Sequence, residues 1–209
     1  MFNINNISKS YGKKQILKDI SFSADKGNAI GILGVNGSGK STLLTCIATL
    51  FSENKDFTVG YLPQENPLFD ELKVVDNMKM WCGLSKSEIL KALNEAPLSN
   101  MKIYEYLDTP VSKMSGGMKK RLSLASVLIN QPDLLLLDEP FAALDLPAKE
   151  DILGYMKTYL ADGGTIIVAS HDEQIFNFCN KVYILKNGEL FDCDLLKANN
   201  ISYTQLLRS

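Results

Sequence analysis

The sequence predicts an α/β fold with a mostly parallel sheet, and three short apolar runs are the basis of this prediction. Residues 29–33, 134–137 and 165–169 consist almost entirely of apolar side chains. Runs this short do not suit a buried helix, but they suit strands that helices cover on both faces. Stretches with apolar residues at helical spacing lie between the runs, as expected when helices connect parallel strands.

A phosphate-binding pattern directly follows the first apolar run. Residues 34–41 read GVNGSGKS and match G-x-x-x-x-G-K-[ST] at every fixed position. Apolar residues at helical spacing come next, so the loop opens a helix near Lys40, whose positive dipole end favours a bound phosphate. The pattern assigns Lys40 to the terminal phosphates of a nucleotide and the Ser41 hydroxyl to Mg2+.

The N-terminal third contains further candidate strands. Residues 1–27 read as short strands and turns, with turns expected at residues 11–12 and 26–27. Residues 58–62 form another candidate strand, which Pro63 ends.

The remaining segments complete the predicted domain. Residues 67–131 look mainly helical, with apolar residues at helical spacing over 118–129. A last strand is expected at 182–185, closed by the turn at Asn187-Gly188. We therefore expect a single domain over 1–209, with a helical subdomain at about 67–131.

Polar residues follow the second and third apolar runs. Asp138 and Glu139 end one run, and Ser170 and His171 end the other. Parallel strands bind ligands beyond their carboxyl ends, so both pairs should lie beside the phosphate loop. Asp138 is then placed to hold Mg2+ through water, and Glu139 to polarise an attacking water. Taken alone, His171 fits an ordinary surface or core histidine as well as it fits a residue of the site.

Composition excludes several classes of protein. The 209 residues carry a net charge of -2 and a pI of about 5.5, which gives no electrostatic footprint for nucleic acid. The short basic cluster at 119–121 reads as a solvated helix face. The four cysteines form no C-x-x-C pair and there is one histidine, so neither a zinc site nor a disulfide framework is expected. We see neither a signal peptide nor an apolar run near the ~20 residues that span a bilayer.

Three further features carry little weight alone. Tyr11 reads as a turn aromatic and Gln64 as a loop glutamine. Residues 115–117, Ser-Gly-Gly, read as a helix N-cap with flexible glycines. The last segment also fits a second anion-binding helix N-terminus.

Taken in order, these features resemble the ATP-binding subunit of an ATP-binding-cassette (ABC) transporter. Seven ordered elements, covering most of the chain, carry the resemblance: Tyr11, the loop at 34–41, Gln64, the segment 114–118, residues 134–139, Leu144-Asp145 and His171. The resemblance implies a P-loop NTPase that hydrolyses ATP with Mg2+ to power a membrane transporter. In that family two subunits pair head to tail around two ATP molecules.

The resemblance implies a role for each matching residue. Tyr11 would stack on adenine. The phosphates would be held by Gly34, Val35, Asn36, Gly37, Ser38, Gly39, Lys40, Ser41 and Thr42. The Mg2+ ligands would be Ser41, Gln64 and Asp138.

The catalytic and intersubunit residues follow in the same way. Glu139 would activate water, His171 would contact the γ-phosphate, and Lys40 and Gln64 would complete the catalytic set. The ATP of the opposite subunit would be reached by Ser115, Gly116 and Gly117, and Asp145 would lie at the dimer contact between the two sites.

Two departures from the family pattern are visible. Met118 stands where the family usually has Gln, although backbone amides and the helix dipole carry the anion binding there. Gln64 lies only 24 positions after Lys40 (64 minus 40), which predicts a shortened antiparallel β subdomain. The form Ser-Gly-Gly-Met-Lys and residues 68–74 are similar to exporter ATPases.

The resemblance also implies partners and a location. We expect a homodimer and a separate transmembrane permease, with residues 67–82 forming the groove for its cytosolic helix. The chain would be cytoplasmic, peripheral on the cytosolic face of the cell membrane through that permease, with no nucleic-acid partner. The transported substrate is not readable from this chain.

Other functions remain as alternatives. A soluble ABC ATPase acting on ribosomes or DNA would usually carry two cassettes, coiled coils or basic insertions, which this sequence does not show. A non-catalytic nucleotide-gated regulator fits poorly with the intact residues Lys40, Asp138, Glu139 and His171. A kinase or hydrolase with another P-loop fold would leave Ser115-Gly116-Gly117 without a role.

Overall fold

The computed structural model of this chain describes residues 1–53, 56–65, 67–95, 98–142, 144, 146–171 and 177–194. Its strands are β1 (Phe2–Tyr11), β2 (Lys14–Ala24), β3 (Ala29–Leu33), β4 (Val59–Leu62), β5 (Leu134–Asp138), β6 (Thr165–Ser170), β7 (Lys181–Lys186) and β8 (Glu189–Asp192). Its α-helices are α1 (Lys40–Ser52), α2 (Val74–Cys82), α3 (Lys86–Asn94), α4 (Gly116–Leu128) and α5 (Leu146–Ala161). Three short 3-10 helices lie at Leu98–Met101, Ile103–Tyr106 and Val111–Lys113.

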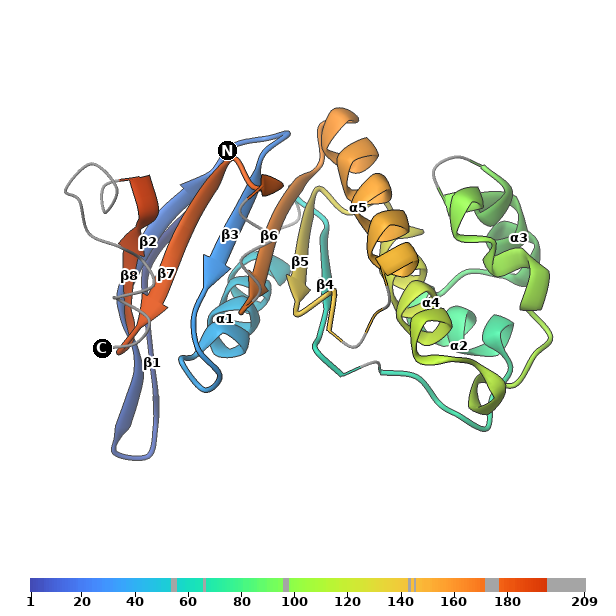
Figure 1. Cartoon of the computed structure of the whole chain (residues 1–209), viewed down its shortest axis with the longest axis horizontal. Coiled ribbons are helices and arrows are strands. Elements are labelled where there is room, and N and C mark those ends of the chain that lie inside the picture. The colour runs from blue at the N-terminus through green and yellow to red at the C-terminus, as the bar shows by residue number, and fades with distance from the viewer. Residues whose placement is uncertain are drawn as a thin grey trace.

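The main sheet has the strand order β4-β5-β6-β3-β7-β8. All neighbouring pairs are parallel except β7 with β8. Every residue of β3, β5 and β6 is buried, as the three apolar runs predicted. The arrows in Figure 1 show that β3, β5 and β6 end on the same side of the molecule. The predicted α/β fold with a mostly parallel sheet is confirmed.

The main sheet separates two hydrophobic cores. One face packs against α1 and the β1–β2 sheet, through residues such as Leu43 and Ile47 of α1. The other face packs against α5 and the helices that follow β4, through residues such as Met156 and Leu124. The helices α2, α3 and α4 therefore share a core with the sheet and lie beyond its β4 edge in Figure 1.

The second sheet is one antiparallel hairpin of β1 and β2. The prediction of short strands over residues 1–27 was wrong, because these two strands run for 10 and 11 residues. Register shifts interrupt their pairing, and Asn6 and Asp19 take positive φ angles of 53° and 49°. Such bulges break the regular alternation of apolar and polar residues that marks a strand in a sequence.

Within the described residues the second sheet has no further strand, in agreement with a shortened antiparallel β subdomain. An aromatic cluster of Phe2, Phe51 and Phe57 packs where the chain runs from α1 toward β4. Its ring centroids lie 4.9 to 6.4 Å apart. This cluster fixes the C-terminal end of α1 against the first residues of β1.

The helical part is less regular than the sequence predicted. Residues 67–131 contain α2, α3 and α4, but the stretch before α4 contains short 3-10 helices and turns. Helix α4 lies close to β4, since a Cβ at Gly60 would come within 2.5 Å of Val127 Cγ1. The fully buried amide of Asn77 holds the turn before α2, bonding to Phe69 N at 2.8 Å, Phe69 O at 3.0 Å and Lys73 O at 3.2 Å.

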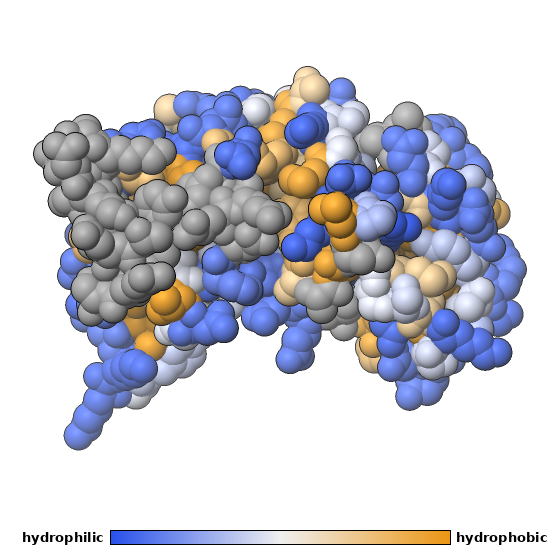
Figure 2. All heavy atoms as spheres, viewed as in Figure 1, coloured by the Kyte–Doolittle hydropathy of each residue, from blue (hydrophilic) through white to orange (hydrophobic). Residues whose placement is uncertain are grey.

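On the face shown in Figure 2, the tip of the β1–β2 hairpin and much of the outer edge near α3 are blue, and hydrophobic atoms gather near α5 in the middle. Among the described residues, no helix has the length and apolar character that crossing a membrane requires.

We expect Phe51→Ala to lower the free energy of unfolding by about 3 to 5 kcal/mol, because it removes a buried aromatic from the cluster. Leu50→Ala in the same helix is the matched control, since Leu50 is 48% exposed and should change stability little. Urea denaturation of both variants measures the difference. Equal losses in the two variants would contradict this role for the cluster.

Candidate nucleotide-binding site

The phosphate loop connects the end of β3 to the start of α1. Gly39 has a φ of 105°, which L side chains rarely adopt, and a Cβ there would lie 2.8 Å from Ile16 Cγ2. The loop can therefore keep this path only with glycine at that position. Helix α1 begins at Lys40, as predicted, so its free N–H groups and its dipole face the loop.

Lys40 is held inside the loop that precedes it. Its Nζ donates hydrogen bonds to Gly34 O at 2.8 Å and Val35 O at 3.3 Å, and it lies 3.5 Å from Glu139 Oε1. The residue is only 6% exposed. A buried ammonium group with these neighbours forms a fixed positive charge beside the backbone cradle.

A cavity of about 430 Å3 gathers the predicted nucleotide residues. It is lined by Tyr11, Ile16, Asn36, Gly37, Gly39, Lys40, Ser41, Thr42, Gln64, Asp138 and Glu139. The two adjacent carboxylates, the loop and Gln64 come from three separate segments of the chain. Tyr11, at the end of β1, is 59% exposed and lines this cavity, and Lys9 Nζ lies 5.7 Å from the centroid of its ring.

Asp138, the last residue of β5, is almost fully buried. Its Oδ1 has no hydrogen-bond partner among the described residues, and the Ser41 side chain lies near enough to act on the carboxylate. Burial raises the pKa of the Asp138 carboxyl, and the charge of Glu139 adds to the rise, although Ser41, Lys40 and Lys120 oppose it. A buried oxygen without a partner beside a serine hydroxyl fits a hard cation such as Mg2+.

Glu139 points in a different direction from Asp138 because its backbone turns. Its φ is +46°, in the left-handed region that non-glycine residues rarely adopt. Its Oε1 is hydrogen-bonded to His171 Nδ1 at 2.9 Å, and Ser170 Oγ donates to Oε2 at 3.0 Å. The strained turn and these bonds direct the carboxylate toward Lys40 and the cavity.

Strand pairing brings these residues together. Asp138 of β5 is in register with Ala169 of β6, and Ser170 is in register with Leu33, the last residue before the loop. Both polar pairs therefore lie at the edge that carries the phosphate loop, as predicted. His171 has a 57% exposed side chain and reaches the site through Glu139.

The Ser-Gly-Gly segment lies at a different place. Ser115 caps α4, its Oγ accepting a hydrogen bond from Met118 N at 3.3 Å. Ser115 and Gly116 are exposed, and neither they nor Gly117 line the nucleotide cavity. Gly116 lines a separate cavity of about 470 Å3. Asp145 lies outside the described residues.

Sequence reasoning missed two features of this region. The cluster at 119–121 was predicted to be a solvated helix face, which is wrong for Lys120, because that residue is only 3% exposed. Its burial follows from tertiary packing against Gln64, which helical spacing alone does not reveal. The hydrogen bond from Ser170 to Glu139 was also missed, although the position of Ser170 at the strand end was noted.

A family model described as ABC transporter matches residues 17–142, which is more than half of the chain. The chain belongs to the ABC transporter family. It is 33% identical to an uncharacterised ABC transporter ATP-binding protein of Methanocaldococcus jannaschii, over 89% of this chain and 74% of that protein. It is 35% identical to the lantibiotic transport ATP-binding protein SrtF of Streptococcus pyogenes, over 82% of this chain and 80% of that protein.

Solved structures of the ABC family share the fold. A structure described as the ATP-binding subunit of an ABC transporter has a TM-score of 0.81 at 24% identity, covering 95% of this chain and 92% of its own. A dimeric bacterial ABC transporter cassette has a TM-score of 0.77 at 24% identity, covering 91% and 96%. These structures share the fold, while the family match and the sequence relatives identify the chain as an ABC transporter ATP-binding domain.

The buried carboxylate predicts a stability effect. The folded-state pKa of Asp138 is raised, so its ionised form makes the folded protein less stable at pH values above the unfolded pKa of about 4. We expect Asp138→Asn to raise the Tm of the nucleotide-free protein at pH 7, with the gain shrinking as the pH falls toward about 4.

Thermal melting at several pH values measures this effect, with exposed Asp162→Asn as the control. A lower Tm for Asp138→Asn at pH 7 would contradict a destabilising carboxylate at this position.

Proposed function

We propose that this cassette hydrolyses ATP with Mg2+ as one half of a dimer, and that hydrolysis powers a separate membrane permease, as in an exporter. The observation that carries the proposal is the single cavity lined by the phosphate loop, Gln64, Asp138 and Glu139. Phosphoryl transfer mainly requires positioning and neutralisation of charge, and these groups supply both.

The position of each residue in the cavity suggests its role in binding ATP or Mg2+. Lys40 and the loop amides would bind the β- and γ-phosphates of ATP. The residues placed to hold Mg2+ are Ser41, Gln64 and Asp138. When bound, Mg2+ neutralises charge on the phosphate oxygens.

Glu139 supplies the basic group for the attacking water. Its carboxylate now shares Oε1 between Lys40 and His171. A γ-phosphate in the cavity would draw these two donors away, leaving the carboxylate free to orient water and to accept its proton. The Ser170 hydroxyl would keep Oε2 in place during this exchange.

The dimer accounts for the Ser-Gly-Gly segment. Ser115 and Gly116, at the start of α4, are exposed and do not line the cavity of their own subunit. A helix N-terminus of this kind suits the phosphates of an ATP bound on a second copy of the chain. The solved cassette described as dimeric supports this assembly.

The permease would dock between β4 and the helical part. A largely apolar cavity of about 520 Å3 there is lined by residues that include Tyr61, Leu68, Trp81 and Val127. Trp81 is 48% exposed. Asn77 braces the turn beside this cavity, so a docked helix would press on a rigid surface.

Relatives support export more than import. By their own names, they include a lantibiotic transport ATP-binding protein, a linearmycin resistance ATP-binding protein and a Nod factor export ATP-binding protein. An Fe(3+) ions import ATP-binding protein is also similar, at 31% identity over 62% of its length. The direction of transport therefore rests on the exporter-like segments together with the greater number of export names among these relatives.

Glu139→Gln should lower kcat for ATP hydrolysis by about 10² to 10⁴-fold, since it removes the base but keeps the shape of the side chain. ATP binding should be retained, and ATP should stabilise the dimer. A phosphate-release assay and size-exclusion chromatography with ATP measure the two effects. Unchanged steady-state hydrolysis would remove Glu139 from this role.

The same variant tests the transporter function. Glu139→Gln protein with ATP and Mg2+ should capture a polytopic membrane protein from detergent-solubilised cells, identified by mass spectrometry. Adding Trp81→Asp should abolish the capture, whereas Tyr104→Asp, at an exposed aromatic outside the docking cavity, should not. Recovery of ribosomal or DNA-bound partners instead would favour a soluble ABC ATPase.

Ser115→Arg should lower ATPase activity at least tenfold while leaving ATP binding to the monomer intact, because the new side chain crowds the ATP of the opposite subunit. Ser115→Arg also removes the helix cap, which lowers the free energy of unfolding by about 1 kcal/mol. Ser115→Asn preserves capping and is therefore the control for this loss of stability. Full activity in Ser115→Arg would contradict the dimer.

A further inference from the structure

Lys120 of α4 is buried, and no carboxylate among the described residues is in hydrogen-bonding contact with it. It is only 3% exposed, which lysine rarely accepts unless it is paired. In the part of the chain that the structure describes, its Nζ makes one hydrogen bond, donating to the backbone O of Gln64 at 3.3 Å. Its neighbour Lys119 instead forms a more exposed ion pair with Asp70, at 2.6 Å. Two adjacent lysines thus have different environments, and only one is buried.

Burying this ammonium group is costly, and nearby charges offset part of the cost. Asp138 and Glu139 both act electrostatically on Lys120 from the nucleotide cavity. The positive end of the α4 dipole lies one turn away and does not stabilise a cation. Buried charges of this kind cluster where the position of the group matters, and the burial of Lys120 fixes its contact with the Gln64 backbone.

Lys120 holds a loop that forms the wall between two cavities. Gln64 follows β4 and lines the nucleotide cavity together with Lys40 and Asp138. Gln64 also lines the second cavity, together with Lys120 and Gly116. Register places Leu62 beside Leu137, so the loop begins directly next to the end of β5. A shift of this loop toward α4 or away from it would therefore change the position of Gln64 beside the nucleotide.

We propose that Lys120 is a positioning residue, which ties the Gln64 loop to α4 and so makes the placement of Gln64 depend on the position of α4. The same helix begins with Ser115, Gly116 and Gly117. One helix would then contact the ATP of the opposite subunit at its first turn and hold a loop of its own nucleotide site at its second. The functional half of this inference rests on the proposed role of Gln64 in ATP hydrolysis.

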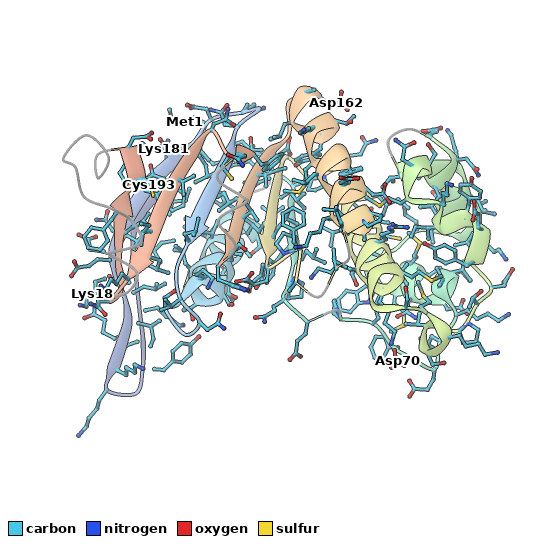
Figure 3. All side chains as sticks on the ribbon, viewed as in Figure 1. Met1, Lys18, Asp70, Asp162, Lys181 and Cys193 are labelled. Carbon is cyan, nitrogen blue, oxygen red and sulfur yellow. The ribbon has the colours of Figure 1, made fainter. Side chains whose placement is uncertain are left out.

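The anchor is testable without ATP. Trp81 is the only tryptophan of the chain and lines the docking cavity with Pro63 and Pro67, which flank the Gln64 loop. Protein labelled with 5-fluorotryptophan should give a single fluorine resonance. Lys120→Met keeps the aliphatic stem but removes the donor, so the resonance should shift or broaden. Lys119→Met on the same helix, which loses only the ion pair with Asp70, should leave it unchanged (Asp70 is labelled in Figure 3).

The functional half is tested by a double-mutant cycle. Lys120→Met should lower kcat about tenfold and leave KM for ATP within about twofold, since it misplaces Gln64 without touching the phosphate loop. Lys120→Arg keeps a donor and has the 470 Å3 cavity beside it, so it should restore most of the activity. In a Gln64→Ala background, Lys120→Met should have little further effect.

Each result decides the proposal. An unchanged fluorine resonance in Lys120→Met would overturn the anchor, and additive effects of Lys120→Met and Gln64→Ala would overturn its action through Gln64. Failure of the proposed function gives a different result: the wild-type protein would then show no Mg2+-dependent hydrolysis, while the fluorine resonance would still report on the anchor.

Discussion

The register between β3, β5 and β6 is the constraint on which the rest of the site depends. Parallel pairing places Asp138 beside Ala169, and Ser170 beside Leu33, so three strands end together at one edge. Residues separated by about a hundred positions in sequence thereby reach the same cavity. A slip of one residue would send the Asp138 side chain to the opposite face of the sheet, since side chains alternate along a strand.

Bound ATP would change the contacts among the charged side chains that are buried at this edge of the sheet. Lys40 lies between loop carbonyls and Glu139, His171 is bonded to the same carboxylate, and Asp138 keeps one oxygen without a partner among the described residues. Keeping the Asp138 carboxylate buried lowers the stability of the folded protein, as the raised pKa of Asp138 indicates. Binding of substrate would recover part of that stability.

Much of the fold and of the phosphate site was predictable because local patterns determine both. The apolar runs at 29–33, 134–137 and 165–169 became β3, β5 and β6 within a residue of the expected bounds, and the phosphate pattern opened α1 at Lys40. The long β1–β2 hairpin was not predictable, since bulges break its alternation. The left-handed backbone of Glu139 and the burial of Lys120 depend on contacts between distant segments, so a lysine on a helix could only be read as solvated. The weak expectations for Gln64 and Tyr11 needed the resemblance, because neither residue lies in a pattern of its own.

The aromatic cluster of Phe2, Phe51 and Phe57 has a mechanical consequence. Helix α1 presents its first turn to the phosphates, and its last turn is packed by these rings against β1. Because the rings hold its last turn, α1 cannot move away from β1 without exposing the cluster. If a nucleotide displaced part of the cassette, this packing would favour movement on the other side of the cavity, at Gln64 and α4. The hydrophobic packing would thus determine, before any ligand binds, which part of the cassette stays in place and which part moves.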